Sequence, residues 1–324
     1  MDHRHEVGQF VLTGSAVPVE EKDMHHSGTG RFSWLTMRPM SLYESGESNG
    51  KVSLKELFES PDKILSVNKL KIDDLAYLIC RGGWPFACGL EAEAALSQAF
   101  DYVDAVIKKD ISRVDGVNRN STTARLLLRS YARNQGSQAT IGTIVADMAT
   151  NDENEISVKT AGCYMEALRK IWNPNLRSKT AVRTANTRYF VDPSIGTAVL
   201  GLGPNDLLKD LNTMGLFFET LCVRDLRVFA DAIDGEVYHF RDKSGLECDA
   251  VVHLRNGKYG LVEIKLGGDR LINEGAENLQ KLAEKINTDK MNEPSFMMVL
   301  VGTGDYAYRR TDGVYVVPIG CLKD

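Results

Sequence analysis

The stretch LECDAVVHLRNGKYGLVEIKL, residues 246–266, decides the fold of the last third of the chain. Apolar and β-branched residues fill two runs within it, Leu246–Leu254 and Tyr259–Leu266. Between the two runs lies Asn256-Gly257, a pair that is typical of a tight turn. The sequence therefore predicts a β-hairpin at this position.

The register of this hairpin decides which charged side chains share a face. Side chains alternate along a strand, so Glu263 and Lys265 point to the same face. A two-residue loop would place Asp249 opposite Ile264, and hence on the other face. A three-residue loop over Asn256–Lys258, or one bulge, would place Asp249 opposite Lys265. We predict this second register, in which all three charged side chains share a face.

The shared face, with a third acid upstream, suits metal-dependent cleavage of a phosphodiester bond. Mg²⁺ prefers hard oxygen ligands, and a positive group near the attacking water or the scissile phosphate assists the reaction. We predict Glu219, Asp249 and Glu263 as metal ligands, and Asp249, Glu263 and Lys265 as the catalytic set, with Gln280 as an accessory residue. A helix with Glu, a strand with Asp and a strand with E-x-K resemble the restriction-endonuclease-like superfamily. The same short acidic pattern also occurs on solvated strand faces.

The whole last third is predicted to be an α/β domain. Its apolar periodicity changes between the helical and the strand pattern several times. The predicted elements are a helix over 211–229, strands over 236–240, 246–254 and 259–266, a helix over 271–286, and strands over 296–301 and 314–318.

The middle of the chain has a different pattern. Helices are predicted over 123–134 and 139–149, and from the N-cap Ser157 to about Ile171, followed by short strand candidates to Val191. This is the order of a winged helix-turn-helix. We expect its basic residues to contact DNA phosphates, whereas the alternative is that the winged helix only joins two domains. The candidate DNA-binding residues are Arg169, Lys170, Arg177, Lys179, Arg183 and Arg188.

Composition limits the class of protein. The 324 residues suggest more than one domain, and 43% hydrophobic with 26% charged residues is ordinary for a globular chain. The formal net charge is −5, so a nucleic-acid surface has to be local. The longest strongly apolar run, 296–301, is too short for a membrane helix, and the polar N-terminus predicts no signal peptide. Six scattered cysteines without a C-x-x-C pair predict a reducing, cytoplasmic setting.

Four further segments carry a resemblance to one family, the prokaryotic AAA+-type ATPases that end in an uncharacterised domain with a restriction-endonuclease-like core. They correspond to the sensor-1 strand, a "GR…LRPLSL" segment, a "GGFP" turn in the helical lid, and the hinge before the C-terminal domain. The matching segments here are GQFVLTGSA at 8–16, GR at 30–31 with LTMRPMSL at 35–42, GGWP at 82–85, and NPNLRSKT at 173–180 with RYFVDP at 188–193.

The resemblance has a consequence for nucleotide binding. Family members carry the Walker A and Walker B motifs before the sensor-1 strand, whereas this chain begins after them and has no G-x-x-x-x-G-K-[ST] loop. The resemblance implies that Thr13, Ser15 and Arg31 are vestigial nucleotide-binding positions. We expect ATP, the cofactor of the complete family, to bind poorly and not to be hydrolysed here. A truncated gene, a late start codon or a fragment would explain the missing part.

We therefore predict a multi-domain α/β protein with three parts. An incomplete AAA+ module with a helical lid covers residues 1–118, a winged helix covers 119–192, and a restriction-endonuclease-like domain covers 193–324. The predicted function is that of the C-terminal portion of an AAA+ protein whose nuclease-like domain contacts DNA, with Mg²⁺ as a possible cofactor. The alternative is a non-enzymatic module that uses a degenerate nuclease fold to bind a protein partner.

Overall fold

The computed structural model describes residues 8, 11, 33, 35–60, 63–152, 155–172, 177–178, 187–287 and 291–324. The chain divides into two compact units, residues 1–36 and 37–324. In the first unit the few described residues form no helix or strand. The vestigial nucleotide-binding positions Thr13, Ser15 and Arg31 lie outside the described residues, as does most of the predicted sensor-1 strand. All helices and strands of the described part belong to the second unit.

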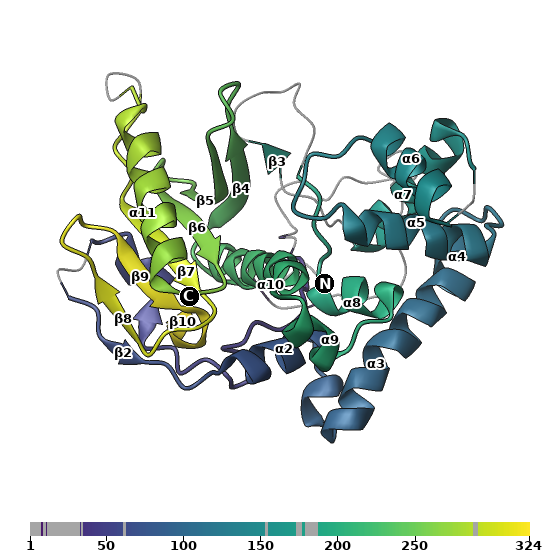
Figure 1. Ribbon diagram of the computed structural model, residues 1–324, viewed down its shortest axis with the longest axis horizontal. Coiled ribbons are helices and arrows are strands. Elements are labelled where there is room, and N and C mark those ends of the chain that lie inside the picture. Colours follow the sequence, from purple (N-terminus) through teal and green to yellow (C-terminus); the bar gives the residue numbers. More distant parts are fainter. Residues whose placement is uncertain are drawn as a thin grey trace, which may run out of the picture. The chain divides into compact units, whose positions relative to one another are not determined.

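The second unit is a mixed α/β structure, as predicted (Figure 1). Its main sheet has the strand order β2-β8-β9-β7-β6-β5-β4-β3 among the described residues, and a small parallel pair joins β1 to β10. β6 lies between antiparallel β5 and parallel β7. The strands are β1 (Val52–Ser53), β2 (Ser66–Val67), β3 (Arg177–Ser178), β4 (Gly235–Arg241), β5 (Glu247–Leu254), β6 (Tyr259–Lys265), β7 (Phe296–Val301), β8 (Tyr306–Arg309), β9 (Tyr315–Pro318) and β10 (Leu322–Lys323).

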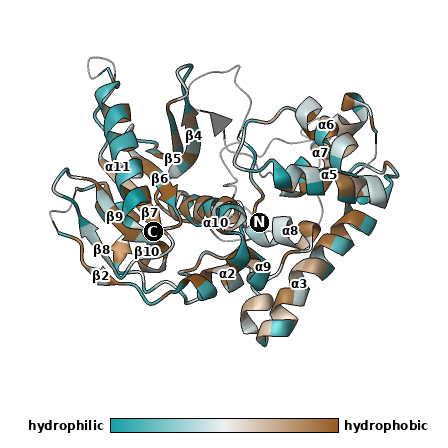
Figure 2. Cartoon of the chain, viewed as in Figure 1, coloured by the Kyte–Doolittle hydropathy of each residue, from teal (hydrophilic) through white to brown (hydrophobic). Residues whose placement is uncertain are grey.

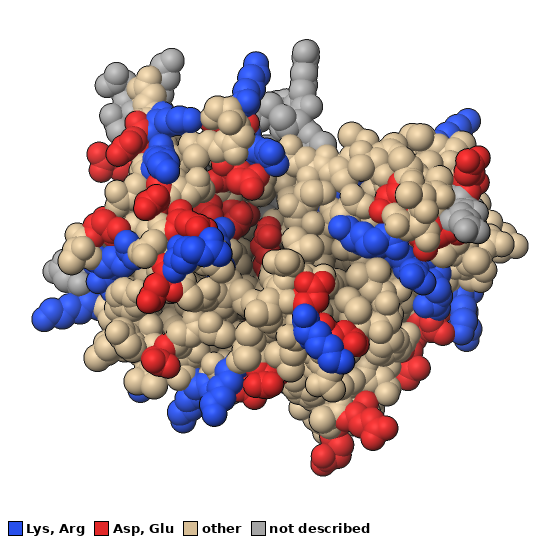
Figure 3. Space-filling view, in the orientation of Figure 1, with Lys and Arg blue, Asp and Glu red and all other residues tan. Residues whose placement is uncertain are grey.

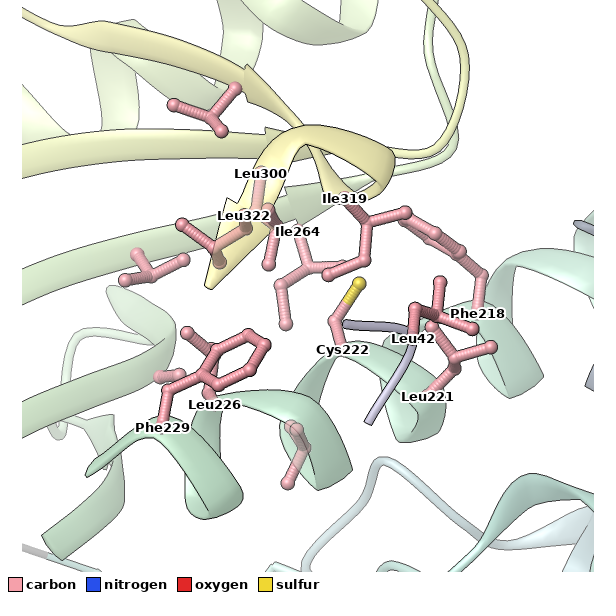
Figure 4. Packing of buried hydrophobic residues seen from close by; sticks show 14 of the residues in the cluster. Leu42, Phe218, Leu221, Cys222, Leu226, Phe229, Ile264, Leu300, Ile319 and Leu322 are labelled. Carbon is pink, nitrogen blue, oxygen red and sulfur yellow. The ribbon is translucent and has the colours of Figure 1, made fainter. Parts of the chain in front are cut away.

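Two long helices cover the two faces of this sheet. α10 (Leu211–Ala232) packs on one face, where its apolar side chains meet Ile264 and Leu300 (Figure 4). α11 (Asp269–Glu284) packs on the other face, against Leu261 and its neighbours. Figure 2 shows hydrophobic residues concentrated along β6 and β7, and hydrophilic residues on the outer side of α11. A central strand that is buried on both faces has a nearly continuous apolar sequence. The charged Glu263 is an exception to this pattern in β6.

Helices α3 to α8 form a second layer with a core of its own, whereas α1, α2 and α9 pack in the core of the main sheet. The core of the second layer is built mainly from apolar residues of α3, α5, α6, α7 and α8. The predicted N-cap is confirmed, because Ser157 Oγ accepts a hydrogen bond of 3.0 Å from Thr160 N. The helices are α1 (Leu54–Leu57), α2 (Ile72–Arg81), α3 (Ala92–Ala105), α4 (Ile111–Arg113), α5 (Ser121–Arg133), α6 (Ile141–Asp152), α7 (Val158–Trp172), α8 (Pro193–Leu200) and α9 (Pro204–Lys209), with a π-helical turn over Val106–Asp110 between α3 and α4.

The three helices predicted in the middle of the chain are present, but the wing after them is not found in the part of the chain that the structure describes. Most of that segment lies outside the described residues. Arg177–Ser178 pairs in parallel with β4 of the main sheet. Arg188 forms an isolated antiparallel bridge with Ser137, which precedes α6. The described backbone of this segment is thus shared between the sheet and the helical layer.

Packing crosses the predicted boundary at residue 118. Apolar residues between Leu42 and Cys80 belong to the same core as the main sheet. β1 pairs with β10, and β2 pairs with β8, so the early segment also shares hydrogen bonds with the end of the chain. A strand of two residues has no stability alone, and these segments depend on the later sheet.

A cluster of three buried charges joins several of the family-like segments. Arg224 of α10 forms ion pairs with Asp192 at 3.0 Å and with Asp225 at 2.7 Å. Asp225 Oδ2 accepts from Leu42 N at 2.9 Å, and Asp192 Oδ2 accepts from Gly83 N at 2.9 Å. We call Arg224, Asp192 and Asp225 the closed cluster. It connects the LTMRPMSL, GGWP and RYFVDP segments to one helix.

None of the helices in the described ranges, which leave out most of the first 34 residues and several short internal stretches, is long and apolar enough to cross a membrane.

Candidate functional site

The site lies where β5 and β6 separate at one end. Their pairing runs from His253 and Tyr259 to Ala250 and Val262 and then stops. On its other edge, β5 has one extra residue at Asp249-Ala250, opposite His239 of β4. Bulges of this kind bend a strand and re-aim a side chain.

The bulge brings the Asp249 carboxylate to the backbone of β6. Its Oδ2 atom accepts a hydrogen bond of 2.7 Å from Ile264 N, beyond the last paired residues of the two strands. The same oxygen lies 3.3 Å from Lys265 Nζ. The side chain of Asp249 therefore bridges the gap that opens between the strands.

The predicted face is confirmed, but the predicted register is not. Ala250 pairs with Val262, so the register continues to place Asp249 level with Glu263 instead of opposite Lys265. Leu254 N donates to Lys258 O at 2.9 Å, which makes the three-residue loop residues 255–257 instead of 256–258. The observed pairing of β5 with β6 differs from the predicted one by two residues. Side chains alternate along a strand with a period of two, so this shift leaves Asp249 on the predicted face.

Lys265 joins the two strand carboxylates. Its Nζ atom lies 2.6 Å from Glu263 Oε2 and 3.3 Å from Asp249 Oδ2. From α11, Asn278 Nδ2 donates to Glu263 Oε1 at 2.8 Å and to the carbonyl of Glu247 at 2.7 Å. We call Asp249, Glu263 and Lys265, together with Glu219 of α10, the acidic site.

Burial and mutual repulsion shape the charges of this site. Burial, and then the charge of Asp249, raise the pKa of Glu263 to about 7. The same two causes raise the pKa of Glu219 to about 8. Burial by itself would lower the pKa of Lys265, but the charges of Asp249 and Glu263 raise it above its usual range. At neutral pH Glu219 is therefore largely protonated and Glu263 about half protonated.

Glu219 is bound from the helical layer. The hydroxyl of Tyr189 donates a hydrogen bond to Glu219 Oε1. Gly136, in the loop between α5 and α6, lies beside the same carboxylate, since a Cβ atom built on it would be 3.5 Å from Oε2. Glu219 itself is only partly buried. Figure 3 shows acidic side chains around a hollow between the sheet and the helical layer.

The three predicted metal ligands do not form a ready-made metal site. Within the described residues, no group of three His, Cys, Asp or Glu side chains is arranged to hold a metal ion. The Lys265 ammonium lies between Asp249 and Glu263, and Tyr189 holds Glu219.

Two of the predicted ligands, Asp249 and Glu263, have the chemistry that Mg²⁺, the cation implied by the resemblance, prefers. Mg²⁺ in phosphoryl-transfer sites is usually held by one or two carboxylates together with water and substrate phosphate. Asp249 and Glu263 each place an oxygen against one ammonium, so the two carboxylates can serve one cation. Their mutual repulsion raises the pKa of Glu263, which a divalent cation would relieve.

The accessory residue Gln280 was predicted at the wrong position. Its Nε2 atom donates to the carbonyl of Asp312 at 3.0 Å, and the contact with Glu263 is made by Asn278. Asn278 and Gln280 are two positions apart in α11, so their side chains are separated by about 200° around the helix axis. The two side chains therefore cannot both face β6. An amide two positions earlier on the amphipathic helix was the signal in the sequence.

Two other residues of the site were missed by sequence reasoning. Tyr189 was used only as part of the hinge segment, and no pattern connects it with Glu219. His239 is buried, its Nδ1 atom has no hydrogen-bond partner among the described residues, and burial lowers its pKa. It lies opposite the bulge that carries Asp249, a position that only the sheet register reveals.

The predicted DNA-binding residues are only partly described. Arg169 and Lys170 are exposed at the end of α7, where Arg169 lies 3.5 Å from Glu166. Arg188 donates through Nε to the carbonyl of Ala139, and its guanidinium lies 5.9 Å from the centre of the Tyr131 ring. Arg188 is therefore partly used in packing. Lys179 and Arg183 lie outside the described residues, and of Arg177 only the backbone is described.

Comparison with known families gives two matches. Residues 72–206 match a domain of unknown function, DUF8612, and residues 214–322 match another, DUF4143. The second is a domain found in AAA-ATPase-associated proteins, which is compatible with the resemblance of the sequence motifs. Comparison with curated proteins finds no match. The acidic side chains of the site fall within the second matched region, whereas Tyr189 falls within the first.

Proposed function

We propose that the acidic site binds Mg²⁺ and catalyses hydrolysis of phosphodiester bonds in a nucleic acid, on a restriction-endonuclease-like core. The observation that supports this best is the pair of strand carboxylates, Asp249 and Glu263, which share the ammonium of Lys265 at the point where two strands separate. A salt bridge that only stabilises the core would not require β5 and β6 to separate beside it. The side chains of Lys265 and Asp249 are partly exposed, at 24% and 14%, whereas that of Glu263 is buried.

In this mechanism each residue has a separate role. Asp249 and Glu263 supply carboxylate oxygens to the cation. When bound, Mg²⁺ would polarise the scissile phosphate and make a bound water more acidic. Lys265, whose pKa is raised, stays protonated and stabilises the negative charge that develops on the phosphate. Asn278 keeps Glu263 in place through its hydrogen bond to Oε1.

The substrate class follows from this chemistry and from the exposed basic residues. DNA is the proposed substrate, with Arg169 and Lys170 at the end of α7 as phosphate contacts. Figure 3 shows a streak of basic side chains over the helical layer. Exchange of Arg169 and Lys170 for alanine should weaken DNA binding and reduce its salt dependence, with cleavage of saturating DNA unchanged.

A plasmid-nicking assay tests the proposed activity. Supercoiled DNA is incubated with the full chain and Mg²⁺ or Mn²⁺, and the wild type is compared with Glu263→Ala and Lys265→Ala. We expect each substitution to reduce the rate about 100-fold or more. Glu274→Ala is the matched control, because Glu274 lies on α11 and pairs only with the exposed Arg270 among the described residues. It should cleave like the wild type.

A non-enzymatic role is the second candidate, and one observation favours it. Lys265 pairs with both strand carboxylates and Asn278 binds Glu263, so these polar groups are satisfied without any ligand. In that case the nuclease-like fold serves as a surface for a protein partner. Absence of cleavage, or cleavage that neither Glu263→Ala nor Lys265→Ala affects, would favour this role.

We also propose that the chain does not hydrolyse ATP, because its sequence contains no phosphate-binding loop that could hold the β- and γ-phosphates. Isothermal titration with ATP and Mg²⁺ tests this. Tight, Mg²⁺-dependent binding by the purified chain would contradict the proposal.

A further inference from the structure

We propose that a cavity in the helical layer binds a small organic anion, a carboxylate with an apolar body about the size of one aromatic ring, and that Arg188 is the partner of the anionic group. The cavity has a volume of about 160 Å³ and lies among α5, α6, α7 and the segment before α8. Its lining residues fall between Leu128 and Phe190 and are separate from the acidic site, so the inference goes beyond the proposed cleavage activity.

The walls of the cavity are apolar, and the polar groups of two aromatic side chains in them are bound elsewhere. Trp172 donates through Nε1 to the hydroxyl of Tyr102 at 3.0 Å, and the Tyr131 hydroxyl donates to the carbonyl of Tyr189 at 2.9 Å. The other apolar lining residues are Leu128, Ile141, Met165, Leu168 and Phe190. An apolar cavity of about 150 Å³ accepts one benzene ring, so this cavity has room for a ligand body of that size.

Arg188 brings a half-buried positive charge to this apolar cavity. Its Nε atom donates to the carbonyl of Ala139, and its guanidinium lies 5.9 Å from the centre of the Tyr131 ring. It forms no ion pair with any carboxylate that the structure describes, and burial lowers its pKa. A buried charge is costly unless it is paired, so an anion that enters the cavity gains an attraction that the protein itself leaves unused.

The two other charged residues of the cavity balance each other. Arg169 Nε lies 3.5 Å from Glu166 Oε2, and their side chains are 60% and 56% exposed. This pair is therefore solvated at the rim, and Arg188 supplies the excess positive charge. A guanidinium has five N–H donors, and with Nε bound to Ala139 the Arg188 group retains donors for a carboxylate.

A glycine keeps the cavity open. Gly162 lines it from within α7, at a position where glycine destabilises a helix relative to alanine. A Cβ atom built on Gly162 would lie 3.9 Å from Ile141 Cδ1, and it would meet no closer atom of another described element. A larger side chain at this position would therefore fill the cavity instead of colliding with the backbone.

Binding of benzoate to the full chain tests the inference, with the Kd measured by ligand-observed NMR titration. Benzoate carries a carboxylate on one ring, benzamide has nearly the same shape without the charge, and acetate has the charge without the ring. We expect benzoate to bind at least about tenfold more tightly than either comparison compound. Absence of benzoate binding, or benzoate affinity no higher than that of benzamide or acetate, would overturn the proposal.

Two pairs of variants locate the site. Arg188→Gln should weaken benzoate binding roughly tenfold or more and leave benzamide binding unchanged. Arg169→Gln is the matched control and should stay within about threefold of the wild type, because Arg169 is exposed and already paired. Gly162→Leu should abolish binding of both ring compounds, whereas Gly162→Ala should bind like the wild type, because one methyl group leaves most of the cavity open.

Urea unfolding separates lost binding from lost folding. Leucine is a better helix former than glycine, so Gly162→Leu should be at least as stable as the wild type. If folded Arg188→Gln or folded Gly162→Leu binds benzoate like the wild type, benzoate binds elsewhere and the proposal falls. Equal weakening in Arg188→Gln and Arg169→Gln would also overturn the role of Arg188. Should Gly162→Leu unfold, the comparison of the two arginine variants decides by itself.

Discussion

The closed cluster and the acidic site each combine one cation with at least two carboxylates, and α10 contributes to both, yet their surroundings differ. In the closed cluster the side chains of Arg224, Asp192 and Asp225 are at most 1% exposed. In the acidic site the side chain of Lys265 is 24% exposed. The cation of the closed cluster is a guanidinium with five N–H donors, whereas the cation of the acidic site is one ammonium group.

The backbone explains the rest of the difference. The two aspartates of the closed cluster accept hydrogen bonds from the backbone N–H groups of Leu42, Gly83 and Ser194, so their charges are satisfied from several sides. In the acidic site the described residues supply one backbone N–H, that of Ile264, to the carboxylates. Burial raises the pKa of Asp225 in the closed cluster as well as those of Glu263 and Glu219, so the two clusters differ in backbone hydrogen bonds and in exposure.

Removal of the cation from each cluster gives the largest expected difference. Arg224→Met should lower the free energy of unfolding by about 3–5 kcal/mol, because two buried carboxylates lose their partner. Lys265→Met should cost only about 1–2 kcal/mol, because Lys265 and Asp249 are partly exposed and the buried Glu263 can take up a proton. Urea unfolding measures both. Equal losses would remove the distinction between the two clusters.

This distinction was only partly predictable from the sequence. The strands around Glu263 and α10 were predicted because their apolar pattern agrees with the packing that they adopt. The common face of Asp249 and Lys265 followed from alternation, which tolerates a displacement by two residues. The short strand β8 (Tyr306–Arg309) was missed, because four residues without a strong pattern form a strand only beside β9.

The contacts between distant segments could not be predicted in the same way. Tyr189 and Glu219 are 30 positions apart, and no periodicity relates them. Likewise, the closed cluster joins three parts that were predicted as separate domains. Leu42 and Gly83 of the first part donate to Asp225 of the third part and to Asp192 of the second part. Both aspartates bind Arg224 of the third part. Local pattern predicts elements, but long-range hydrogen bonds depend on how the elements pack.

The pH dependence of stability tests the protonation of Glu219. The pKa of Glu219 is raised to about 8, so the folded state binds more protons than the unfolded state between about pH 4.5 and 8. Stability therefore falls as pH rises through this window, by up to about 1.4 kcal/mol per pH unit. Glu219→Gln should flatten the dependence in chemical denaturation between pH 5 and 8. An unchanged slope would show that Glu219 is not the group that titrates.

Cation binding should depend on pH in the opposite sense. Carboxylates with pKa values of about 7 and 8 must release protons before they bind a metal. The Mn²⁺ affinity of the wild type should therefore rise at least about tenfold between pH 6 and 8. Glu219→Gln should show a weaker rise, because one titrating group is lost. A constant affinity across this range would separate metal binding from these carboxylates.

The smallest expected effects on stability come from removing a neutral side chain that donates a hydrogen bond to each cluster. These side chains are Ser194 in the closed cluster and Asn278 in the acidic site. Ser194 Oγ donates to Asp192 at 2.6 Å and accepts from Trp84 Nε1 at 2.9 Å, all in buried or half-buried surroundings. Ser194→Ala should cost about 1–3 kcal/mol of stability, because a buried carboxylate and an indole N–H each lose a partner.

Asn278→Ala is the corresponding change in the acidic site, where Asn278 binds Glu263 Oε1. It should cost about 1 kcal/mol or less, because Lys265 remains on the other oxygen of Glu263 and the carboxylate can protonate. The same variant should reduce Mn²⁺ affinity, whereas Ser194→Ala should leave it unchanged. A fold-stabilising cluster responds in stability alone, and a binding site responds in affinity. The reverse pattern in these two variants would exchange the roles assigned to the two clusters.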